Sequence, residues 1–385
     1  MSKIKEYIHF FVAYYLTRLY AWIIPIRRNR FVFLCMGGNS YGDSVKSLSD
    51  YISENHENAE IVWAFTNDYY KKVDCSHKKV FFGSFKYFYY VISSKYYISN
   101  CYAPFMIIKR HGQVVLQTWH GTALKRIGID SVGQSDHSKF EKMIRPDVKK
   151  TGNKNTDIFI SGSKFMSDVY HRALGYSKEI SLTGTPRTDL FFHKHEDIDN
   201  KVRCFYHLGN DVKVILYAPT FRPGGTFEYY DIDLPQIRDY YSKKDDCNYV
   251  VIVRLHPNLA SKEKELNNLF SFDFINATYY PNMQELLYAS DILVTDYSSV
   301  MFEFMLSYKP IILYVPDKET YNRGFYFDVD NLPFIIIDNN KDIRKKLSMF
   351  DDMTYRNAII SFCSQLGFVE DGHATERVYN LLMSK

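Results

Sequence analysis

The stretch Asp291–Phe304, DILVTDYSSVMFEF, decides the fold of this 385-residue chain. Its apolar run, Ile292–Val294, is short enough for a buried strand of a parallel sheet, and Val300–Leu306 reads as the helix that follows. Ser298 and Ser299 stand where that helix begins. A helix start carries unpaired N–H groups and positive partial charge, so phosphate binds there readily. Taken alone, this turn is better explained by Ser298 merely capping the helix, so the other strand ends must decide.

Strand-like runs alternate with helix-like runs almost throughout the chain, which predicts an α/β protein with parallel sheets flanked by helices. Two sets of strands predict two Rossmann-like, doubly wound domains, with their boundary in the polar segment 193–210. We expect an N-terminal helix in 1–28, an N-terminal domain in 29–195 and a C-terminal domain in 196–385. We also expect the last helix, about 375–383, to pack on the first domain. The predicted strands are 31–36, 60–65, 96–99, 114–119, 157–161 and 180–183, then 214–218, 249–255, 274–276, 291–295, 310–315 and 334–337.

Polar side chains cluster directly after five of these strands, where ligands of open parallel sheets bind. Arginine offers a bidentate fork for phosphate, and histidine can supply a base beside it. One such cluster alone is better explained by packing, but five together predict an anionic substrate with a diphosphate, held between the two domains. The candidate binding residues among them are Trp119, His120, Gly121, Thr122, Lys125, Arg187, Pro219, Thr220, Arg222, Arg254, His256, Asp296, Ser298 and Ser299.

Composition excludes several other classes. The net charge of +4 is too mild to indicate a nucleic-acid partner, and the 24% of charged residues is typical of a globular chain. The six cysteines lack metal-site or disulfide-framework spacing, which favours a reducing cytoplasm. Gly37–Ser44, GGNSYGDS, has the glycine spacing of a phosphate loop, but Asp43 stands where that loop needs lysine, so an NTPase is excluded. We expect no cofactor and no obligatory metal.

The N-terminus predicts a helix that lies on a membrane surface. One apolar stripe is formed by Ile4, Ile8, Phe11, Tyr15, Leu19, Trp22 and Ile26, and Arg27, Arg28 and Arg30 follow it. Arg18 makes a spanning helix expensive, and no clean signal-peptide pattern is present. We therefore expect the helix at the interface with its arginines on anionic lipid, and the alternative is a helix packed on its own domain.

Seven motifs together resemble the CDP-glycerol glycerophosphotransferases of bacterial teichoic-acid synthesis. They cover about seven-tenths of the chain, from Val114 to the C-terminus, and they read WHGTALK, GTPRTD, APTFR, RLHP, TDYSSVMFEF, RGFYFD and EDGHATERV. The resemblance implies a GT-B fold whose two domains face a central cleft, with the acceptor on the N-terminal domain and the CDP-alditol donor mostly on the C-terminal one. It also implies a peripheral protein at the cytoplasmic face of the cell membrane, with an undecaprenyl-diphosphate-linked saccharide as acceptor.

The resemblance carries the donor-contacting positions of the family onto His120, Gly121, Thr122, Arg187, Pro219, Thr220, Arg254, His256, Ser298 and Ser299. Glu303 stands where the family has an aspartate after the serine pair. We expect His120 to act as general base and His256, Arg187 and Arg254 to stabilise charge while glycerol phosphate is transferred and CMP is released. The alternatives are transfer from CDP-ribitol, a capsule-forming enzyme with the same donor, a sugar-nucleotide glycosyltransferase of the same fold, and a nucleotide binder without activity.

Overall fold

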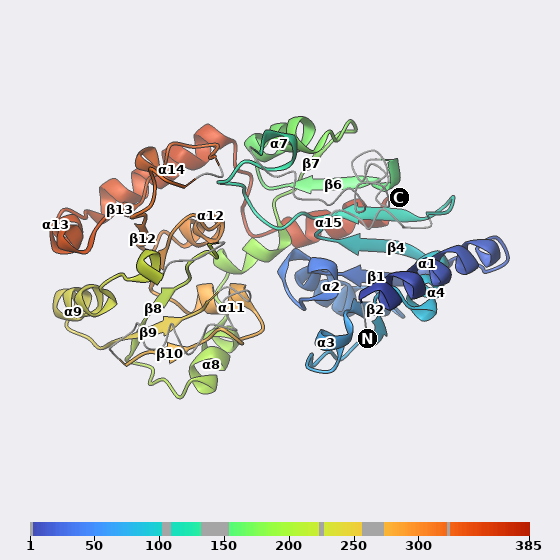
Figure 1. Ribbon diagram of the computed structural model, residues 1–385, viewed down its shortest axis with the longest axis horizontal. Helices are drawn as coiled ribbons and strands as arrows, with labels where there is room; N and C mark the ends of the chain where they lie inside the picture. Colours follow the sequence, from blue (N-terminus) through green and yellow to red (C-terminus); the bar gives the residue numbers. More distant parts are fainter. Residues whose placement is uncertain (1–2, 102–108, 132–153, 223–226, 256–272, 322–323) are drawn as a thin grey trace. The chain divides into compact units, whose positions relative to one another are not determined.

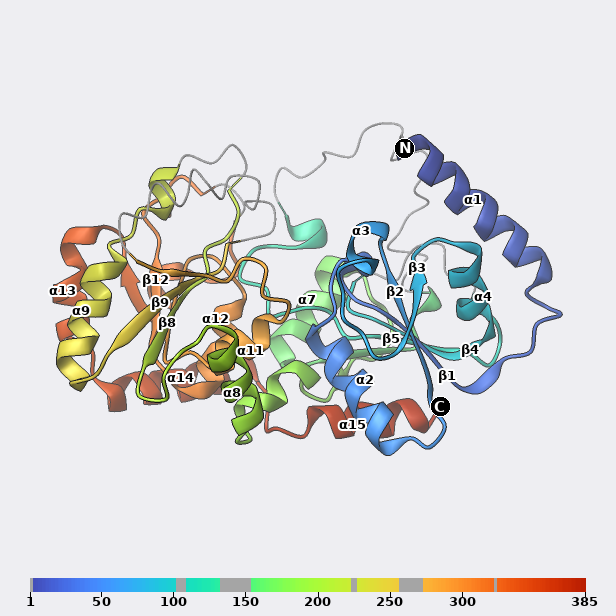
Figure 2. The same cartoon turned by 90° about the horizontal axis from the view of Figure 1, so that it is seen from below.

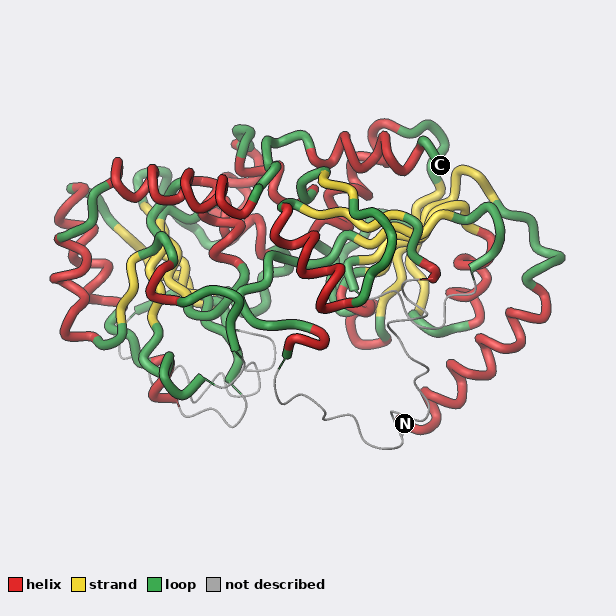
Figure 3. Tube along the Cα trace, turned by 90° about the horizontal axis from the view of Figure 1, so that it is seen from above, coloured by secondary structure: helices red, strands yellow, loops and turns green. Residues whose placement is uncertain are grey.

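The computed structural model describes residues 3–101, 109–131, 154–222, 227–255, 273–321 and 324–385. The chain forms two compact units, each built on one parallel sheet (Figure 1). Unit 1 is made of Met1–His120, Ser135–Asp189 and Phe368–Lys385, and unit 2 of Gly121–Gln134 and Leu190–Gly367. In each unit the strands lie in the middle and the helices around them (Figure 3). The α/β class with two parallel sheets is therefore confirmed, whereas the cleft between the domains stays a prediction.

Unit 1 has a seven-stranded sheet of order β3-β2-β1-β4-β5-β6-β7, and every pairing in it is parallel. Side chains alternate across the sheet, so Phe31 and Phe33 pack under α2 and α15, whereas Val32 and Leu34 pack under α4 and α1. Helices thus cover both faces, as in a doubly wound fold. The strands are β1 (Arg27–Leu34), β2 (Glu60–Phe65), β3 (Lys78–Phe81), β4 (Ser94–Ser99), β5 (Val114–Gln117), β6 (Ile158–Ser161) and β7 (Ser181–Leu182). The helices are α1 (Lys3–Tyr20), α2 (Asp43–Asn55), α3 (Asn67–Tyr70), α4 (Phe85–Ser93), α7 (Lys164–Leu174) and α15 (Ala374–Met383).

Unit 2 has a six-stranded parallel sheet of order β10-β9-β8-β11-β12-β13. A hydrophobic core lies between this sheet and helices α9 and α13. The strands are β8 (Lys213–Tyr217), β9 (Tyr249–Val253), β10 (Ile275–Asn276), β11 (Ile292–Thr295), β12 (Ile311–Tyr314) and β13 (Ile335–Ile337). The helices are α8 (Glu196–Phe205), α9 (Leu234–Asp245), α11 (Met283–Tyr288), α12 (Val300–Phe304), α13 (Ile343–Ser348) and α14 (Asp352–Leu366).

All twelve predicted strands are present, although their ends are shifted. The run predicted at 31–36 begins four residues earlier, at Arg27, and ends at Leu34. Strand β3 was not predicted, because only Val80 of Lys78–Phe81 is buried at this edge of the sheet. A single buried residue leaves no apolar run or alternation to detect.

Helix α1 is apolar on two sides. Its buried side, formed by Phe10, Ala13 and Tyr14, packs on α4 (Figure 2). The predicted stripe lies on the other side, where Tyr15, Leu19 and the following Trp22 are 57%, 64% and 79% exposed. The helix therefore packs on its own unit and also presents an apolar face to solvent. Within the described residues, no helix is both long enough and apolar enough to cross a membrane.

Two details of the N-terminal prediction are wrong. The helix ends at Tyr20, and Arg27, Arg28 and Arg30 belong to strand β1. Arg30 cannot contact lipid, because its side chain is 2% exposed and its Nε donates to Glu60 Oε2 at 2.8 Å. The guanidinium also donates to Ser93 Oγ. Sequence periodicity alone could not show that Arg30 is a buried residue of a strand and not an exposed residue after a helix.

The C-terminal segment returns to unit 1, as expected for the last helix. The Asp189 carboxylate caps α15 by accepting hydrogen bonds from Ala374 N at 2.9 Å, Thr375 N at 2.7 Å and Thr375 Oγ1 at 2.6 Å. Leu382 and Val378 of α15 lie fully buried in the core beside α2. The chain also changes units at Asp189 and Leu190, and Gly121–Gln134 belongs to unit 2. The predicted boundaries at 195/196 and at the C-terminus therefore do not coincide with the limits of these units. Interactions between residues distant in sequence determine where the units begin and end.

A second carboxylate, Glu370, holds the turn before α15 against the GTPRTD motif. It accepts hydrogen bonds from Thr185 N at 2.9 Å, Thr185 Oγ1 at 2.8 Å and Thr188 Oγ1 at 2.7 Å. Two glycines make room for it, since a Cβ at Gly162 would lie 2.1 Å from Glu370 Oε1 and one at Gly184 2.8 Å from Oε2. Burial raises the pKa of Glu370 to about 7, although these hydrogen bonds act in the opposite direction.

The raised pKa predicts how stability depends on pH. Folded protein binds the Glu370 proton more tightly than unfolded protein, so this group's contribution falls as pH rises from about 4.5 to about 7. At about 1.4 kcal/mol per pKa unit, the loss is about 3 kcal/mol at most. Urea unfolding from pH 4.5 to 7.5 should therefore show Glu370→Gln losing less stability than wild type. The exposed Glu376→Gln on α15 is the matched control and should follow wild type; parallel curves for all three proteins would contradict the assignment.

Candidate functional site

Each sheet has one point where the strand order reverses, and ligands of doubly wound folds bind beyond the strand ends there. In unit 1 this point lies between β1 and β4, and in unit 2 between β8 and β11. Asn100 follows β4 in unit 1, and Thr220 and Asp296 follow β8 and β11 in unit 2. Two predicted site residues, Thr220 and Asp296, are thus placed where the topology favours binding.

In unit 1, Asp43 and Arg187 form a buried ion pair. Asp43 Oδ1 accepts from Arg187 Nη1 at 2.7 Å and from Ser44 N at 2.5 Å, and Asp43 Oδ2 accepts from Asn100 Nδ2 at 2.7 Å. The Arg187 side chain is only 3% exposed. Burial alone would raise the pKa of Asp43, but Arg187 and these hydrogen bonds lower it below its ordinary value, so the carboxylate is ionised at neutral pH.

His120 lies beside this pair, after β5, with its ring fixed on both sides. Its Nδ1 lies 2.8 Å from the carbonyl oxygen of Asn100, and its ring stacks on Trp119 with centroids 4.4 Å apart. A carbonyl can only accept, so Nδ1 carries the proton and Nε2 keeps its lone pair. Burial lowers the pKa of His120 below its ordinary value, and Arg187 acts in the same direction, whereas Asn100 and Asp43 oppose it. The imidazole is therefore neutral at pH 7 and suited to accept a proton.

The backbone around His120 is strained at three non-glycine positions. Met36, Asp43 and Trp119 have φ of 46°, 63° and 55°, in the left-handed region. Such conformations persist where the surroundings over-determine them, and they concentrate at functional sites. Asn100 supplies part of that constraint, because its Oδ1 accepts from Met36 N at 2.8 Å while its Nδ2 holds Asp43.

In unit 2, the corresponding strand ends are joined by a buried triad of Arg222, Asp296 and Asp317. Arg222 Nη1 donates to Asp296 Oδ2 at 2.5 Å, and its Nε and Nη2 donate to Asp317 at 2.7 and 3.1 Å. The three side chains are each 4% exposed. Burial opposes the charge of Arg222, but the two carboxylates raise its pKa further above an already high value. Arg222 is thus engaged on all three of its nitrogens.

The triad holds the APTFR and TDYSS turns together. Asp296 accepts from Thr220 N at 3.0 Å with both oxygens, and Thr295 Oγ1 donates to Ala218 O at 2.7 Å. Pro219, which lies between Ala218 and Thr220 in the sequence, is also buried. The hydroxyl of Tyr297 donates to Asp317 Oδ1 at 3.0 Å. We infer that Arg222 and Asp296 hold these turns in place rather than contact a ligand directly.

An aromatic layer covers the triad. Tyr297 packs on Tyr321 and Phe325 with ring centroids 4.1 and 5.0 Å apart, and Lys125 Nζ lies 5.8 Å from the centre of the Tyr321 ring. Lys125 also pairs with Phe325 through an antiparallel bridge, which attaches the WHGTALK segment to unit 2. The part of this motif that belongs to unit 2 begins with Gly121, which has φ of 142°, and Thr122, whereas His120 belongs to unit 1.

Ser298 and Ser299 are half-exposed at the start of α12. Ser299 is the N-cap residue but makes no side-chain cap bond, so the simple capping explanation does not hold for its hydroxyl. Helix α12 has only five residues before it tightens into a 3₁₀ turn, shorter than the predicted Val300–Leu306 helix. Glu303 is 5% exposed and accepts from Gln284 Nε2 at 3.1 Å.

The remaining predicted residues divide as follows. Arg254 follows β9, and its backbone N donates to Tyr217 O at 2.9 Å beside the APTFR turn. His256 lies outside the described residues, as does Arg323 of the RGFYFD motif. Sequence reasoning missed Asn100 and Asp317 and rejected Asp43 together with the phosphate-loop hypothesis. Asp317, an acid two residues after an apolar strand run, offered a signal that could have found it.

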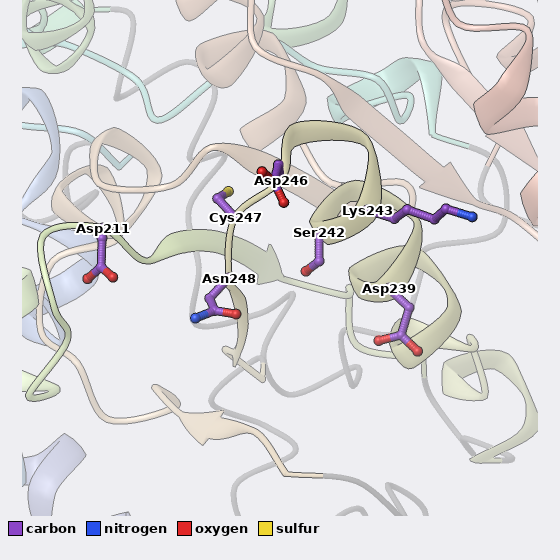
Figure 4. A pocket seen from close by; sticks show the side chains of 7 residues that line it. All are labelled: Asp211, Asp239, Ser242, Lys243, Asp246, Cys247 and Asn248. Carbon is purple, nitrogen blue, oxygen red and sulfur yellow. The ribbon is translucent and has the colours of Figure 1, made fainter.

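A surface pocket of unit 2 is unrelated to these strand ends. It lies where β8 and β9 begin and α9 ends, at the opposite ends of these strands (Figure 4). Three carboxylates and one lysine line it, which disfavours a diphosphate. Its residues are Asp211, Asp239, Ser242, Lys243, Asp246, Cys247 and Asn248. Among the residues that the structure describes, no group of three His, Cys, Asp or Glu side chains could hold a metal ion.

Known proteins are similar to this chain in both sequence and fold. The chain is 29% identical to the teichoic acid poly(glycerol phosphate) polymerase of Bacillus subtilis strain 168 over 379 residues, which are 93% of this chain and 49% of that protein. It therefore spans about half the length of that polymerase. It is also 29% identical to the teichoic acid glycerol-phosphate transferase of Staphylococcus aureus, covering 91% of this chain and 92% of that one. The ribitol-phosphate primase of Bacillus spizizenii is 27% identical, with 95% and 94% covered.

A solved structure of the wall teichoic acid polymerase TagF soaked with CDPG superimposes on the whole chain. The TM-score is 0.81 at 25% identity, and 98% of that chain is covered. The fold is therefore TagF-like and of the GT-B kind. Residues 16–384 match the family described as CDP-glycerol:poly(glycerophosphate) glycerophosphotransferase. This chain belongs to that family of teichoic-acid phosphate transferases.

Proposed function

We propose that the protein transfers glycerol phosphate from CDP-glycerol to a hydroxyl of a lipid-linked acceptor in teichoic-acid synthesis, and that CMP is released. The observation that carries this proposal is the position of the His120 ring against the Asn100 carbonyl. Its Nδ1 is held by the Asn100 carbonyl, which leaves Nε2 to accept the acceptor's proton as the hydroxyl attacks the distal phosphorus. Membership in the family supports CDP-glycerol as the donor.

The other predicted residues would serve binding. In the proposal, Arg187, Arg254 and His256 stabilise charge on the diphosphate, while Ser298, Ser299 and Thr220 offer hydroxyl and backbone donors to phosphate. Trp119, Gly121, Thr122, Lys125 and Pro219 would shape the strand-end loops around the substrate. Since Arg222 and Asp296 engage each other, they would act by holding the Thr220 turn. We assign the acceptor to unit 1 and the donor mainly to unit 2.

Donor identity is the less constrained part of the proposal. Relatives that act with glycerol phosphate and with ribitol phosphate are similar to this chain to nearly the same degree. Glu303 stands where the family has an aspartate and accepts a hydrogen bond from Gln284, so we expect the alditol end of the site to differ here. CDP-ribitol is therefore the second candidate donor.

His120→Ala should lower kcat for CMP release by about 10² to 10⁴-fold, the usual contribution of a general base. The measurement is CMP release from CDP-glycerol and CDP-ribitol with a panel of undecaprenyl-diphosphate-linked acceptors, with and without EDTA. The exposed His111→Ala is the control and should keep wild-type rates. Release of CDP or UDP from a sugar nucleotide instead of CMP would indicate a glycosyltransferase. Loss of activity in EDTA, or a near-normal His120→Ala, would contradict the mechanism.

We also propose that the protein is peripheral to the cytoplasmic face of the cell membrane. The support is the exposed apolar face after and along α1, formed by Val12, Leu16, Leu19, Trp22 and Ile23, next to the exposed Arg28. Apolar side chains at headgroup depth and arginines near anionic lipid would hold such a helix in the interface.

A triple variant, Leu19→Ser, Trp22→Ser and Ile23→Ser, should lower binding to phosphatidylglycerol-containing vesicles by about tenfold or more, because apolar burial is lost. Co-sedimentation measures the bound fraction. Substitution is preferable to deletion of α1, since α1 also covers α4 and its removal would expose core. Met349→Ser with Met353→Ser removes two equally exposed side chains from unit 2 and should leave binding unchanged. Equal binding by both variants would end the membrane proposal.

A further inference from the structure

Asp43 lies in none of the motifs that identify the family. Hydrogen bonds nevertheless connect it to Arg187 directly and to His120 through Asn100. One carboxylate oxygen accepts from Arg187 at 2.7 Å, and the other accepts from the Asn100 side chain at 2.7 Å. The backbone carbonyl of the same Asn100 holds His120 Nδ1 at 2.8 Å. Arg187 and His120 are thus connected through one carboxylate and one amide residue.

The segment that carries Asp43 is shaped for this position. Asp43 is the first residue of α2 and has φ of 63°, a conformation that costs free energy for any residue with a Cβ. The preceding loop closes on Asn100 at two further points, since Met36 N donates to Asn100 Oδ1 at 2.8 Å and Asn100 Nδ2 lies 3.3 Å from Cys35 Sγ. Asn100 is fully buried, so no solvent competes for these bonds.

A surface salt bridge could not do the same. Arg187 is 3% exposed and the Asp43 side chain 14%, so the pair is screened little by water. A displacement of about 1 Å at either end would move the guanidinium or the imidazole out of its productive place, and such a displacement can cost about 10²-fold in rate. The carboxylate must therefore be both charged and correctly placed.

We propose that Asp43 is a positioning residue for the transfer reaction: it fixes the guanidinium of Arg187 directly and the imidazole of His120 through Asn100. This inference rests on the proposed function, because the roles of Arg187 and His120 are assigned there. It adds the loop before α2 to the site and gives a function to a sequence that resembles a phosphate loop but cannot bind a triphosphate.

Three variants test the proposal. Asp43→Asn removes the charge, Asp43→Glu keeps it but displaces the carboxylate by one methylene, and Asp50→Asn is the control on the same helix. Asp50 forms a surface ion pair with Lys46 at 2.5 Å. Wild-type CMP release from CDP-glycerol or CDP-ribitol is measured first, and its absence would refute the proposed function, not the positioning role.

We expect kcat/KM to fall by about 10²-fold in Asp43→Asn and at least tenfold in Asp43→Glu, with Asp50→Asn unchanged. If Asp43 only compensated the charge of Arg187, Asp43→Glu would keep wild-type rates, and that result would overturn the proposal. Asp43→Glu also keeps the test valid if Asp43→Asn does not fold, which thermal unfolding followed by circular dichroism will show.

A second readout does not depend on activity. In ¹⁵N-histidine NMR spectra, wild type and Asp50→Asn should show His120 as a single neutral tautomer with the proton on Nδ1. Asp43→Glu should show a mixture of tautomers or exchange broadening at His120. His120→Ala provides the assignment. Unchanged His120 signals in a folded Asp43→Glu protein would contradict the proposal.

Discussion

A buried carboxylate that holds an arginine at a strand end is the interaction on which both units depend. In unit 1 it is Asp43 with Arg187, and in unit 2 it is Asp296, joined by Asp317, with Arg222. Removing one partner of such a pair leaves an uncompensated buried charge, which typically costs 3–5 kcal/mol. These pairs therefore fix the loops beyond the sheets more firmly than backbone hydrogen bonds alone could. Both lie where the strand order reverses, so rigidity is placed where a ligand is expected.

The N-terminal helix shows how one sequence pattern can serve two surfaces. Periodicity correctly placed Tyr15, Leu19 and Trp22 on one side, and that side is exposed. Thr17 lies on the opposite side of the helix, where it is 7% exposed and donates to Ala13 O at 2.6 Å. A hydroxyl that bonds its own helix backbone can be buried without a further partner. Polar character alone therefore did not reveal which side packs on α4.

Much of the fold could be predicted from the sequence because strands of a buried parallel sheet are short apolar runs, and their ends carry polar residues. This is why Thr220, Asp296 and Arg187 could be selected without coordinates. The partners of these residues could not be predicted. Asp43 and Arg187 are 144 residues apart in sequence, and Thr185 and Glu370 are 185 apart, so no local pattern joins them. The role of Asn100 could not be predicted for another reason. At His120 it is the backbone carbonyl that accepts the hydrogen bond, and any residue can supply a carbonyl.

The charge balance of these clusters bears on how a diphosphate could be held. Asp43 balances the charge of Arg187. Arg222 faces two carboxylates, Asp296 and Asp317, so its charge is more than balanced. Neither cluster therefore carries a net positive charge of its own. In the proposed site, hydroxyl and N–H donors at the α12 turn would act together with Arg187, with Arg254 after β9 and with Lys125 on its aromatic layer. Fixed donors of this kind discriminate by geometry more than by charge, because each stabilises an oxygen only at hydrogen-bond distance. Such a site would favour a substrate whose phosphates are placed by the rest of the molecule over free phosphate, which is the behaviour that transfer from a nucleotide-activated donor requires.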